Sequence, residues 1–146
     1  MVDVTTNIII FSPKDKVSAY ATDPDNAPEW YKNIKSVEWK TPKPLTIGSK
    51  ISFRAKFLGR ELAYTYEITT FIPGEKLVMQ TAEGPFPMET TYQWKAVDNN
   101  ATLMTLRNMG KPSGFSKFFA PFMKIAMRSA NKKDLILLKS ILEKKS

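Results

Sequence analysis

Hydrophobic residues alternate with polar residues along most of the first 110 positions of this 146-residue chain. Such alternation is typical of β-strands that have one buried face and one exposed face. Turn-forming residues such as Pro73-Gly74 and Asp98-Asn99 divide the region into short runs, so the links between successive strands are short. The pattern predicts strands at residues 2–11, 34–40, 50–57, 62–72, 77–82, 88–97 and 102–109.

The segment between the first two predicted strands has a helical pattern instead. Ser12 followed by Pro13 suits the start of a short helix, because serine caps helices and proline is tolerated in the first turn. Asn26 with Glu29 resembles a capping box, which predicts a second, very short helix that carries Trp30. We therefore expect two short helices directly after the first strand.

A helical period returns at the C-terminus, where residues 115–145 are predicted to form one long amphipathic helix. The first half of its apolar face is rich in Phe and Met, and the second half in Leu and Ile. Aromatic and thioether side chains often line adaptable apolar surfaces, so we expect the first half to form a cavity wall and the second to pack as ordinary core. The apolar face consists of Phe115, Phe119, Phe122, Met123, Ala126, Met127, Ala130, Leu137, Leu138 and Ile141.

These elements predict one α+β domain that spans residues 1–146. Short links between successive strands imply an antiparallel meander, and alternation implies that one face of the sheet is covered. The long C-terminal helix is the obvious cover. No internal repeat and no linker divides the chain further.

The residue types that are missing restrict the chemistry. With no histidine and no cysteine, the chain excludes Ser-His-Asp and Cys-His catalysis, disulfides and cysteine-ligated metals. A zinc or iron site would need carboxylates alone, so we predict no metal and no cofactor. Any catalysis would have to use Asp, Glu, Lys, Tyr, Arg or bound water.

The net charge of +8 is concentrated at the C-terminus, since residues from 115 onward carry +6 of it. A solvated lysine face is the ordinary interpretation, and transient attraction to an anionic membrane is the alternative. We expect no nucleic-acid partner, because the basic residues match no reader motif. The chain lacks an apolar run near 18 residues and a secretory leader, which predicts a cytoplasmic protein. The basic stripe comprises Lys117, Lys124, Arg128, Lys132 and Lys139.

Four local motifs support a resemblance to a known superfamily. They are Asp-Pro-Asp-Asn-Ala-Pro-Glu-Trp-Tyr at 23–31, Ile-Gly-Ser at 47–49, Ile-Pro-Gly-Glu-Lys-Leu at 72–77, and Lys-Asp-Leu at 133–135 with Leu138. With the order of elements, they make the whole chain resemble the START, Bet v 1-like and polyketide-cyclase superfamily (SRPBCC), in its polyketide cyclase/dehydrase-type branch. These motifs support the fold and carry no chemistry, so no catalytic residue is transferred from the resemblance.

The resemblance implies a helix-grip fold, in which a curved antiparallel sheet of about seven strands wraps the C-terminal helix and leaves an apolar ligand cavity. Alternation places Tyr64 and Tyr66 inward, where a buried phenol needs a hydrogen-bond partner. A partner within the protein is the ordinary interpretation, and a ligand carbonyl or hydroxyl is the alternative. Phe86, held between two prolines, is expected either at the cavity rim or as a plug at the end of the sheet. The predicted ligand-binding residues are Phe53, Phe57, Tyr64, Tyr66, Met79, Phe86, Met88, Tyr92, Trp94, Asn108, Phe119, Phe122 and Met123.

Asp134 lies at the same helical angle as Met127 and Ile141, which puts a carboxylate on the covered face. Because an unpartnered buried charge is costly, we expect Asp134 to anchor the helix to the short helices near Trp30. Its position in the aliphatic half predicts that it lies away from the aromatic cavity wall. The charged strand residues expected on the convex face, as cross-strand pairs, are Glu67, Glu89 and Arg107.

The sequence supports three function classes unequally. The leading hypothesis is binding of a small hydrophobic or amphipathic molecule, such as a lipid, an isoprenoid or a polyketide-like compound, between the sheet and the C-terminal helix. The second is a cyclase or dehydratase that moves protons with Tyr64, Tyr66 or water, and the absence of histidine and cysteine weighs against it. The third is an interaction module that resembles the activators of a chaperone ATPase, and the aromatic inward set weighs against it.

Overall fold

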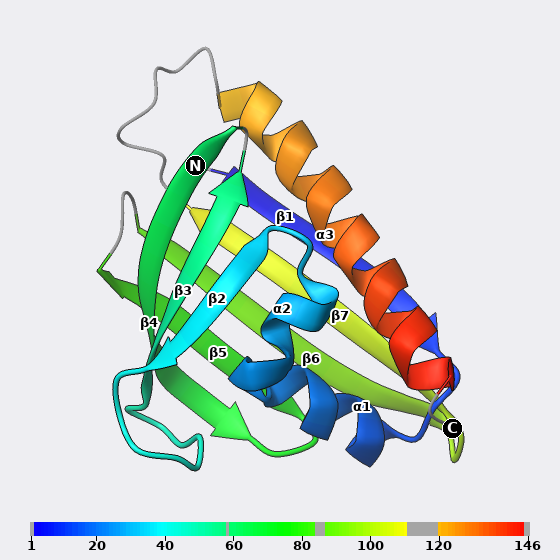
Figure 1. Ribbon diagram of the computed structural model, residues 1–146. Coiled ribbons are helices and arrows are strands. Elements are labelled where there is room, and N and C mark those ends of the chain that lie inside the picture. Colours follow the sequence, from blue (N-terminus) through cyan, green and yellow to red (C-terminus); the bar gives the residue numbers. More distant parts are fainter. Residues whose placement is uncertain (1, 58, 84–86, 111–119, 145–146) are drawn as a thin grey trace.

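The computed structural model describes residues 2–57, 59–83, 87–110 and 120–144 (Figure 1). Its seven strands form one antiparallel sheet in the order β1-β7-β6-β5-β4-β3-β2. Strands β2 to β7 therefore form a meander, and β1 pairs with β7 at one edge. The elements are β1 (Val2–Ile10), α1 (Lys14–Thr22), the 3-10 helix η1 (Pro24–Asn26), α2 (Ala27–Trp30), β2 (Ile34–Trp39), β3 (Lys50–Phe57), β4 (Arg60–Ile72), β5 (Lys76–Glu83), β6 (Met88–Asp98), β7 (Ala101–Gly110) and α3 (Ala120–Lys144).

The α+β helix-grip architecture predicted from the sequence is confirmed. Every predicted strand is present, with ends that differ from the prediction by at most two residues. The turn predicted at Pro73-Gly74 is also present: the Glu75 amide donates to the Ile72 carbonyl over 2.9 Å, and Gly74 has a φ of +80°. This is the backbone of a type II turn, which favours proline and then glycine at its centre. The first five positions of the predicted long helix lie outside the described residues.

Neither helix-capping prediction is correct. Helix α1 begins at Lys14 with Pro13 as its cap residue, and the hydroxyl of Ser12 has no partner among the described residues. Asn26 has helical backbone angles because it closes η1, whereas a capping residue needs an extended backbone. Its side-chain amide donates instead to the Tyr20 carbonyl over 3.2 Å, so it ties η1 to α1.

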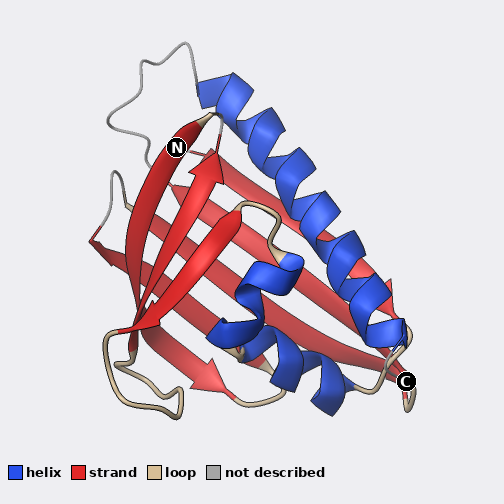
Figure 2. Cartoon of the chain, viewed as in Figure 1, coloured by secondary structure: helices blue, strands red, loops and turns tan. Residues whose placement is uncertain are grey.

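Helix α3 crosses the sheet along β1, and α2 lies between β2 and α3 and contacts both (Figures 1 and 2). The core is tightest where α3 meets β1 and β7, because Leu138 of α3 and Val4, Met104 and Leu106 of the strands have no exposed surface. Toward β2 the sheet curves away from α3, and α2 lies between them. This arrangement positions the candidate site described below.

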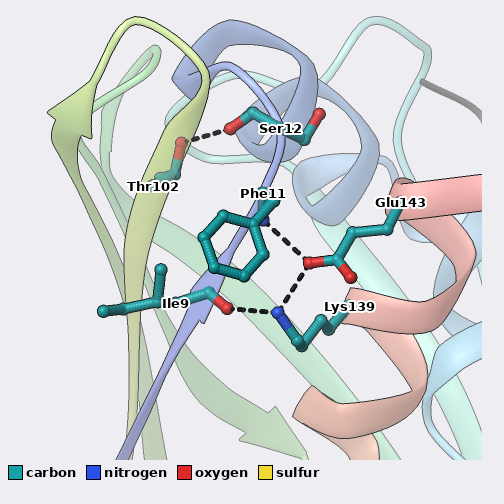
Figure 3. A network of polar contacts seen from close by, with 6 residues as sticks. All are labelled: Ile9, Phe11, Ser12, Thr102, Lys139 and Glu143. Carbon is teal, nitrogen blue, oxygen red and sulfur yellow. Dashed lines mark hydrogen bonds and ion pairs between the residues drawn. The ribbon is translucent and has the colours of Figure 1, made fainter.

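The C-terminal part of α3 is held by a polar network that we call the C-terminal clamp, formed by Lys139 and Glu143 with Ile9 and Phe11 (Figure 3). Lys139 Nζ donates to the Ile9 carbonyl over 2.8 Å and lies 2.6 Å from a carboxylate oxygen of Glu143. The same oxygen accepts the Phe11 amide over 2.8 Å, and Lys139 Nζ lies 4.3 Å from the centre of the Phe11 ring. The prediction that Lys139 belongs to a free basic stripe is therefore wrong, because its ammonium caps the end of β1.

The predicted cross-strand partners on the convex face are confirmed. Arg107 of β7 donates two hydrogen bonds to Asp3 of β1, over 3.0 and 2.7 Å. Glu67 lies directly opposite Lys50, with 4.0 Å between the charged atoms, and Glu89 accepts a 2.9 Å hydrogen bond from Gln80. These charges are spread over the outside of the sheet.

Candidate functional site

A cavity of about 150 Å³ lies among α2, α3 and the inward face of the sheet. Strands β2 to β7 supply most of its wall, and α3 closes one side. The lining is largely aromatic, aliphatic and methionine, with a few polar side chains. The described residues that line it are Ala27, Tyr31, Asn33, Ile34, Phe53, Ala55, Leu62, Tyr64, Tyr66, Met79, Met88, Thr90, Tyr92, Asn108, Met127, Ala130, Asn131 and Asp134.

The structure brings the predicted strand residues together at this cavity. Lining side chains include Phe53, Tyr64, Tyr66, Met79, Met88, Tyr92 and Asn108. Trp94 and Met123 are buried in the surrounding core instead, at 3% and 1% exposure. Phe86 and Phe119 lie outside the described residues, as does the side chain of Phe57.

The prediction that Phe122 points inward is wrong, because its side chain is 58% exposed. The buried face of α3 passes through Met123, Met127, Asn131 and Asp134. If the buried face of a helix is predicted from apolar residues alone, exposed apolar residues such as Phe122 are wrongly included and buried polar residues are wrongly left out. The part of α3 that borders the cavity therefore lies further along the helix than the Phe-rich start suggested.

The aromatic wall of the cavity is a chain of ring contacts. Tyr31 stacks on Trp30 with 4.1 Å between ring centres, and Tyr92 lies 5.8 Å from the same indole. On the other side Tyr66 lies 5.8 Å from Phe53 and 5.9 Å from Tyr64. Tilted and edge-on contacts at these separations are favourable, so the rings stabilise one another around the cavity.

The phenol groups in this wall remain neutral near pH 7. The hydroxyls of Tyr31 and Tyr92 lie 2.5 Å apart in a mutual hydrogen bond. Burial raises the pKa of the Tyr66 hydroxyl to about 12, and its hydroxyl donates weakly to the Met88 sulfur over 3.9 Å. These groups can donate or accept hydrogen bonds and are not bases at ordinary pH.

A polar pair lies on the strand side of the cavity. Thr90 of β6 donates to the side-chain carbonyl of Asn108 of β7 over 2.6 Å, and both residues are buried. They face each other across the β6–β7 ladder, where Thr90 is paired with Asn108. Because this bond uses the Asn108 carbonyl, the amide nitrogen is the part of Asn108 that is left to donate.

Asp134 is the one acidic side chain among the described residues that line the cavity, and it is only 2% exposed. Its Oδ1 accepts the backbone amide of Lys32, just after α2, over 3.1 Å. Burial raises the pKa of this carboxyl from its usual 3.8 to about 6. The predicted anchor to the short helices is confirmed. The predicted distance from the aromatic wall is wrong, because Asp134 lines the same cavity as the tyrosines.

Asn131 is one helical turn before Asp134 and is 4% exposed. Its side-chain nitrogen has no hydrogen-bond partner among the described residues. An unpartnered buried amide is destabilising, because the group has lost its water without gaining a replacement. The helix side of the cavity is therefore less completely bonded than the strand side.

Sequence reasoning missed the contribution of the segment after α2, where Tyr31, Asn33 and Ile34 line the cavity. The adjacent aromatic residues Trp30 and Tyr31 could have predicted this contribution, because two neighbouring rings at a very short helix are expected to pack against another part of the protein. Nothing in the sequence indicated that Asn131 would face the cavity.

A second, more open groove of about 650 Å³ lies on the outside, between α1 and the β2–β3 connection. Its polar groups are largely satisfied by one another. Asp25 accepts the Trp39 indole N–H over 2.9 Å and pairs with Lys43 over 2.7 Å. We regard the smaller, better enclosed cavity as the candidate site, since enclosure removes ligand surface from water.

Two further features are absent from the described residues. Within residues 2–57, 59–83, 87–110 and 120–144, no helix is long and apolar enough to cross a membrane. Over those same ranges, no three acidic side chains gather closely enough to form a metal-binding group.

Comparison with known protein families identifies one that extends over almost the whole chain. The sequence model of the family described as "Polyketide cyclase / dehydrase and lipid transport" matches residues 1–143. The chain belongs to this family. The resemblance inferred from the local motifs is thereby confirmed.

Solved structures with the same fold span several kinds of organism. A START superfamily protein from Mycobacterium smegmatis superposes with a TM-score of 0.84 at 12% identity, over 99% of both chains. The Zhui aromatase/cyclase from Streptomyces sp. R1128 gives 0.83 at 13% identity, over 98% of this chain and 94% of the other. The ginseng major latex-like protein 151 gives 0.72 at 11% identity, over 96% of each chain. These likenesses establish the fold, and comparison with curated proteins finds no match.

Proposed function

We propose that this family member binds a small amphipathic organic molecule in the cavity between the sheet and α3. The observation that carries the proposal is a largely aromatic cavity with a few convergent polar groups. Such a lining buries an apolar ligand body and orients it through a small number of hydrogen bonds. A purely structural core would be expected to fill this volume, because protein interiors pack at the density of organic crystals.

The cavity volume limits the ligand that fits without rearrangement. A cavity near 150 Å³ is about the size that holds one benzene-sized ring. The volume thus favours a single-ring compound, a short isoprenoid or one ring of a polyketide-like molecule over a long-chain lipid. Larger ligands would require α3 or the segment after α2 to move.

Native mass spectrometry of freshly purified protein tests this proposal, with extraction of any bound small molecule. We expect a co-purifying compound, or saturable one-to-one binding of a hydrophobic fluorescent probe by protein that still unfolds cooperatively. Absence of both in the folded protein would leave the aromatic residues as core and favour an interaction module.

A second candidate function is proton transfer to or from a bound carbonyl compound. The observation that favours it is the carboxyl of Asp134, whose pKa of about 6 suits a group that exchanges a proton near neutral pH. One structural relative, Zhui, is an aromatase/cyclase. Turnover of a polyketide-like substrate that disappears in Asp134→Asn, with binding retained, would establish this function over simple binding.

We also propose transient contact between the outer face of α3 and anionic membranes, through which a ligand would be collected or released. This face exposes Phe122, Ile125 and Ile136 at 58%, 67% and 51%, among the exposed cations Lys124 and Arg128. A basic face with apolar residues complements an anionic bilayer, and each Lys or Arg near the surface contributes about 1 kcal/mol.

Vesicle co-sedimentation tests the membrane proposal. We expect binding to anionic vesicles that is lost at high salt, weak binding to zwitterionic vesicles, and reduced binding in the double variant Lys124→Ser, Arg128→Ser. Equal sedimentation with both vesicle types would remove the proposal and leave ligand binding in the cavity unaffected.

A further inference from the structure

The carboxylate of Asp134 is incompletely partnered within the described part of the chain. Its one hydrogen bond there, from the Lys32 amide, goes to Oδ1, and no described cationic side chain lies within ion-pair distance. A buried carboxylate ordinarily has either an opposite charge or several hydrogen bonds. Asp134 is 2% exposed and lines the cavity, so a ligand in the cavity is well placed to supply the missing partner.

The described residues that line the cavity offer aromatic rings and no cationic side chain, and the Lys32 ammonium attracts the Asp134 carboxylate only from beyond ion-pair distance. Tyr31, Tyr64, Tyr66, Tyr92 and Phe53 line the same space as Asp134. Aromatic faces carry partial negative charge and attract organic cations, which is why clusters of rings bind ammonium groups. An ammonium group would thus meet two independent sources of attraction, whereas a carboxylate ligand would be repelled by Asp134.

We propose that the ligand of this cavity is a small amine, whose ammonium group pairs with the Asp134 carboxylate while its apolar body contacts the tyrosine-rich wall. The inference rests on the proposed binding function and specifies its ligand class. A cation supplies the opposite charge that Asp134 lacks within ion-pair distance among the described residues, and a neutral hydroxyl does not. The cavity volume restricts the apolar body to about one ring.

Four single-ring probes test the inference: toluene, benzyl alcohol, benzylamine and benzoate, each titrated calorimetrically into the wild-type protein at pH 7.5. They share the ring and differ in the polar group. We expect benzylamine to bind about tenfold or more tightly than benzyl alcohol, as charge-assisted pairing in a buried site predicts, and benzoate to bind most weakly.

Two variants locate the effect. Asp134→Asn removes the charge and keeps an oxygen that can accept the Lys32 amide, so we expect benzylamine to lose its advantage over benzyl alcohol while toluene binding is unchanged. Met127→Leu, on the same face of α3, is the matched control, and it should change the affinities of toluene and benzylamine by the same factor. Circular dichroism melting establishes that each variant is folded.

Each contrary outcome has a separate meaning. Equal binding of toluene, benzyl alcohol and benzylamine would overturn the amine inference and leave the binding function intact. If benzyl alcohol bound most tightly, the amine inference would be overturned, and the preferred ligand would carry a neutral hydrogen-bond donor in place of a cation. If Asp134→Asn kept the preference for benzylamine, the role proposed for Asp134 would be wrong. If that variant did not fold, the order of affinities in the wild-type protein would still test the preference for an amine. No binding of any probe to folded wild-type protein would overturn the binding function as well.

Discussion

The two halves of α3 have different relations to the sheet. In the C-terminal half Leu135, Leu138 and Leu142 are almost fully buried against the strands, and the C-terminal clamp fixes the end of the helix. In the preceding half, Met127 and Asn131 border a cavity. One continuous helix therefore combines a tightly packed half with a half that leaves space against the sheet.

In this fold, the packing that stabilises α3 and the cavity proposed to bind a ligand lie mainly at different positions along the helix. The packed half gains free energy from complete burial and the clamp, so it can hold α3 in place whether or not the cavity is filled. The cavity-lining side chains of α3 include a sparsely bonded carboxylate at Asp134, where the two halves meet, and an amide at Asn131 with no partner among the described residues. Both lower stability in the absence of a ligand. Unsatisfied polar groups of this kind are expected where a protein binds something.

The largest expected effect comes from truncating one apolar side chain in each half. Leu138→Ala removes a side chain with no exposed surface and should lower the free energy of unfolding by about 3–5 kcal/mol. Met127→Ala enlarges an existing cavity, so it should cost less, about 2 kcal/mol. Urea denaturation measures both values. Equal losses would show that the two halves are packed alike.

Two substitutions at Asp134 separate its hydrogen bond from its charge. Asp134→Ala leaves the Lys32 amide without an acceptor, whereas Asp134→Asn retains one. We expect the alanine variant to be about 1–3 kcal/mol less stable than the asparagine variant in urea denaturation at pH 7. If the two variants had the same stability, Asp134 would not be an anchor between α3 and the segment after α2.

Because the pKa of Asp134 is raised, the free energy of unfolding should decrease as the pH rises. The contribution of Asp134 to stability is complete below the usual pKa of 3.8 and is lost as the pH rises through about 6, because the buried site favours the protonated form. Between pH 4 and 7 the wild type should lose about 1–3 kcal/mol relative to Asp134→Asn. Both proteins are denatured across this pH range, and in the difference between their free energies of unfolding the contributions of the other titrating groups cancel. A constant difference between them would contradict the assigned pKa.

A smaller effect is expected from Asn131→Leu, which replaces an unpartnered amide with an apolar side chain of similar size. The change should raise the free energy of unfolding by about 1 kcal/mol, because a buried donor without a partner is removed. Thermal melting of the ligand-free protein measures it. A loss of stability would mean that the amide is satisfied and that this side of the cavity is completely bonded.

The same contrast explains what could be predicted from sequence. The strands followed from alternation because a period of two is imposed by burial of one face, and turns such as Pro73-Gly74 have specific backbone requirements. The phase of α3 was harder to predict, since Phe122 is apolar yet exposed and Asn131 is polar yet buried. The hydrophobic pattern predicts the residues of a fully packed core well. It fails to predict the lining of a cavity in which polar residues are buried.

The most direct test of the account is to fill the cavity from α3. Ala130 borders the cavity, so Ala130→Leu should occupy part of its volume with little change in fold, because the added side chain enters existing space. Calorimetric titration with toluene should then show one saturable site in the wild type and none in the variant, both with cooperative melting. Undiminished binding by a folded Ala130→Leu would place the ligand elsewhere and contradict the account.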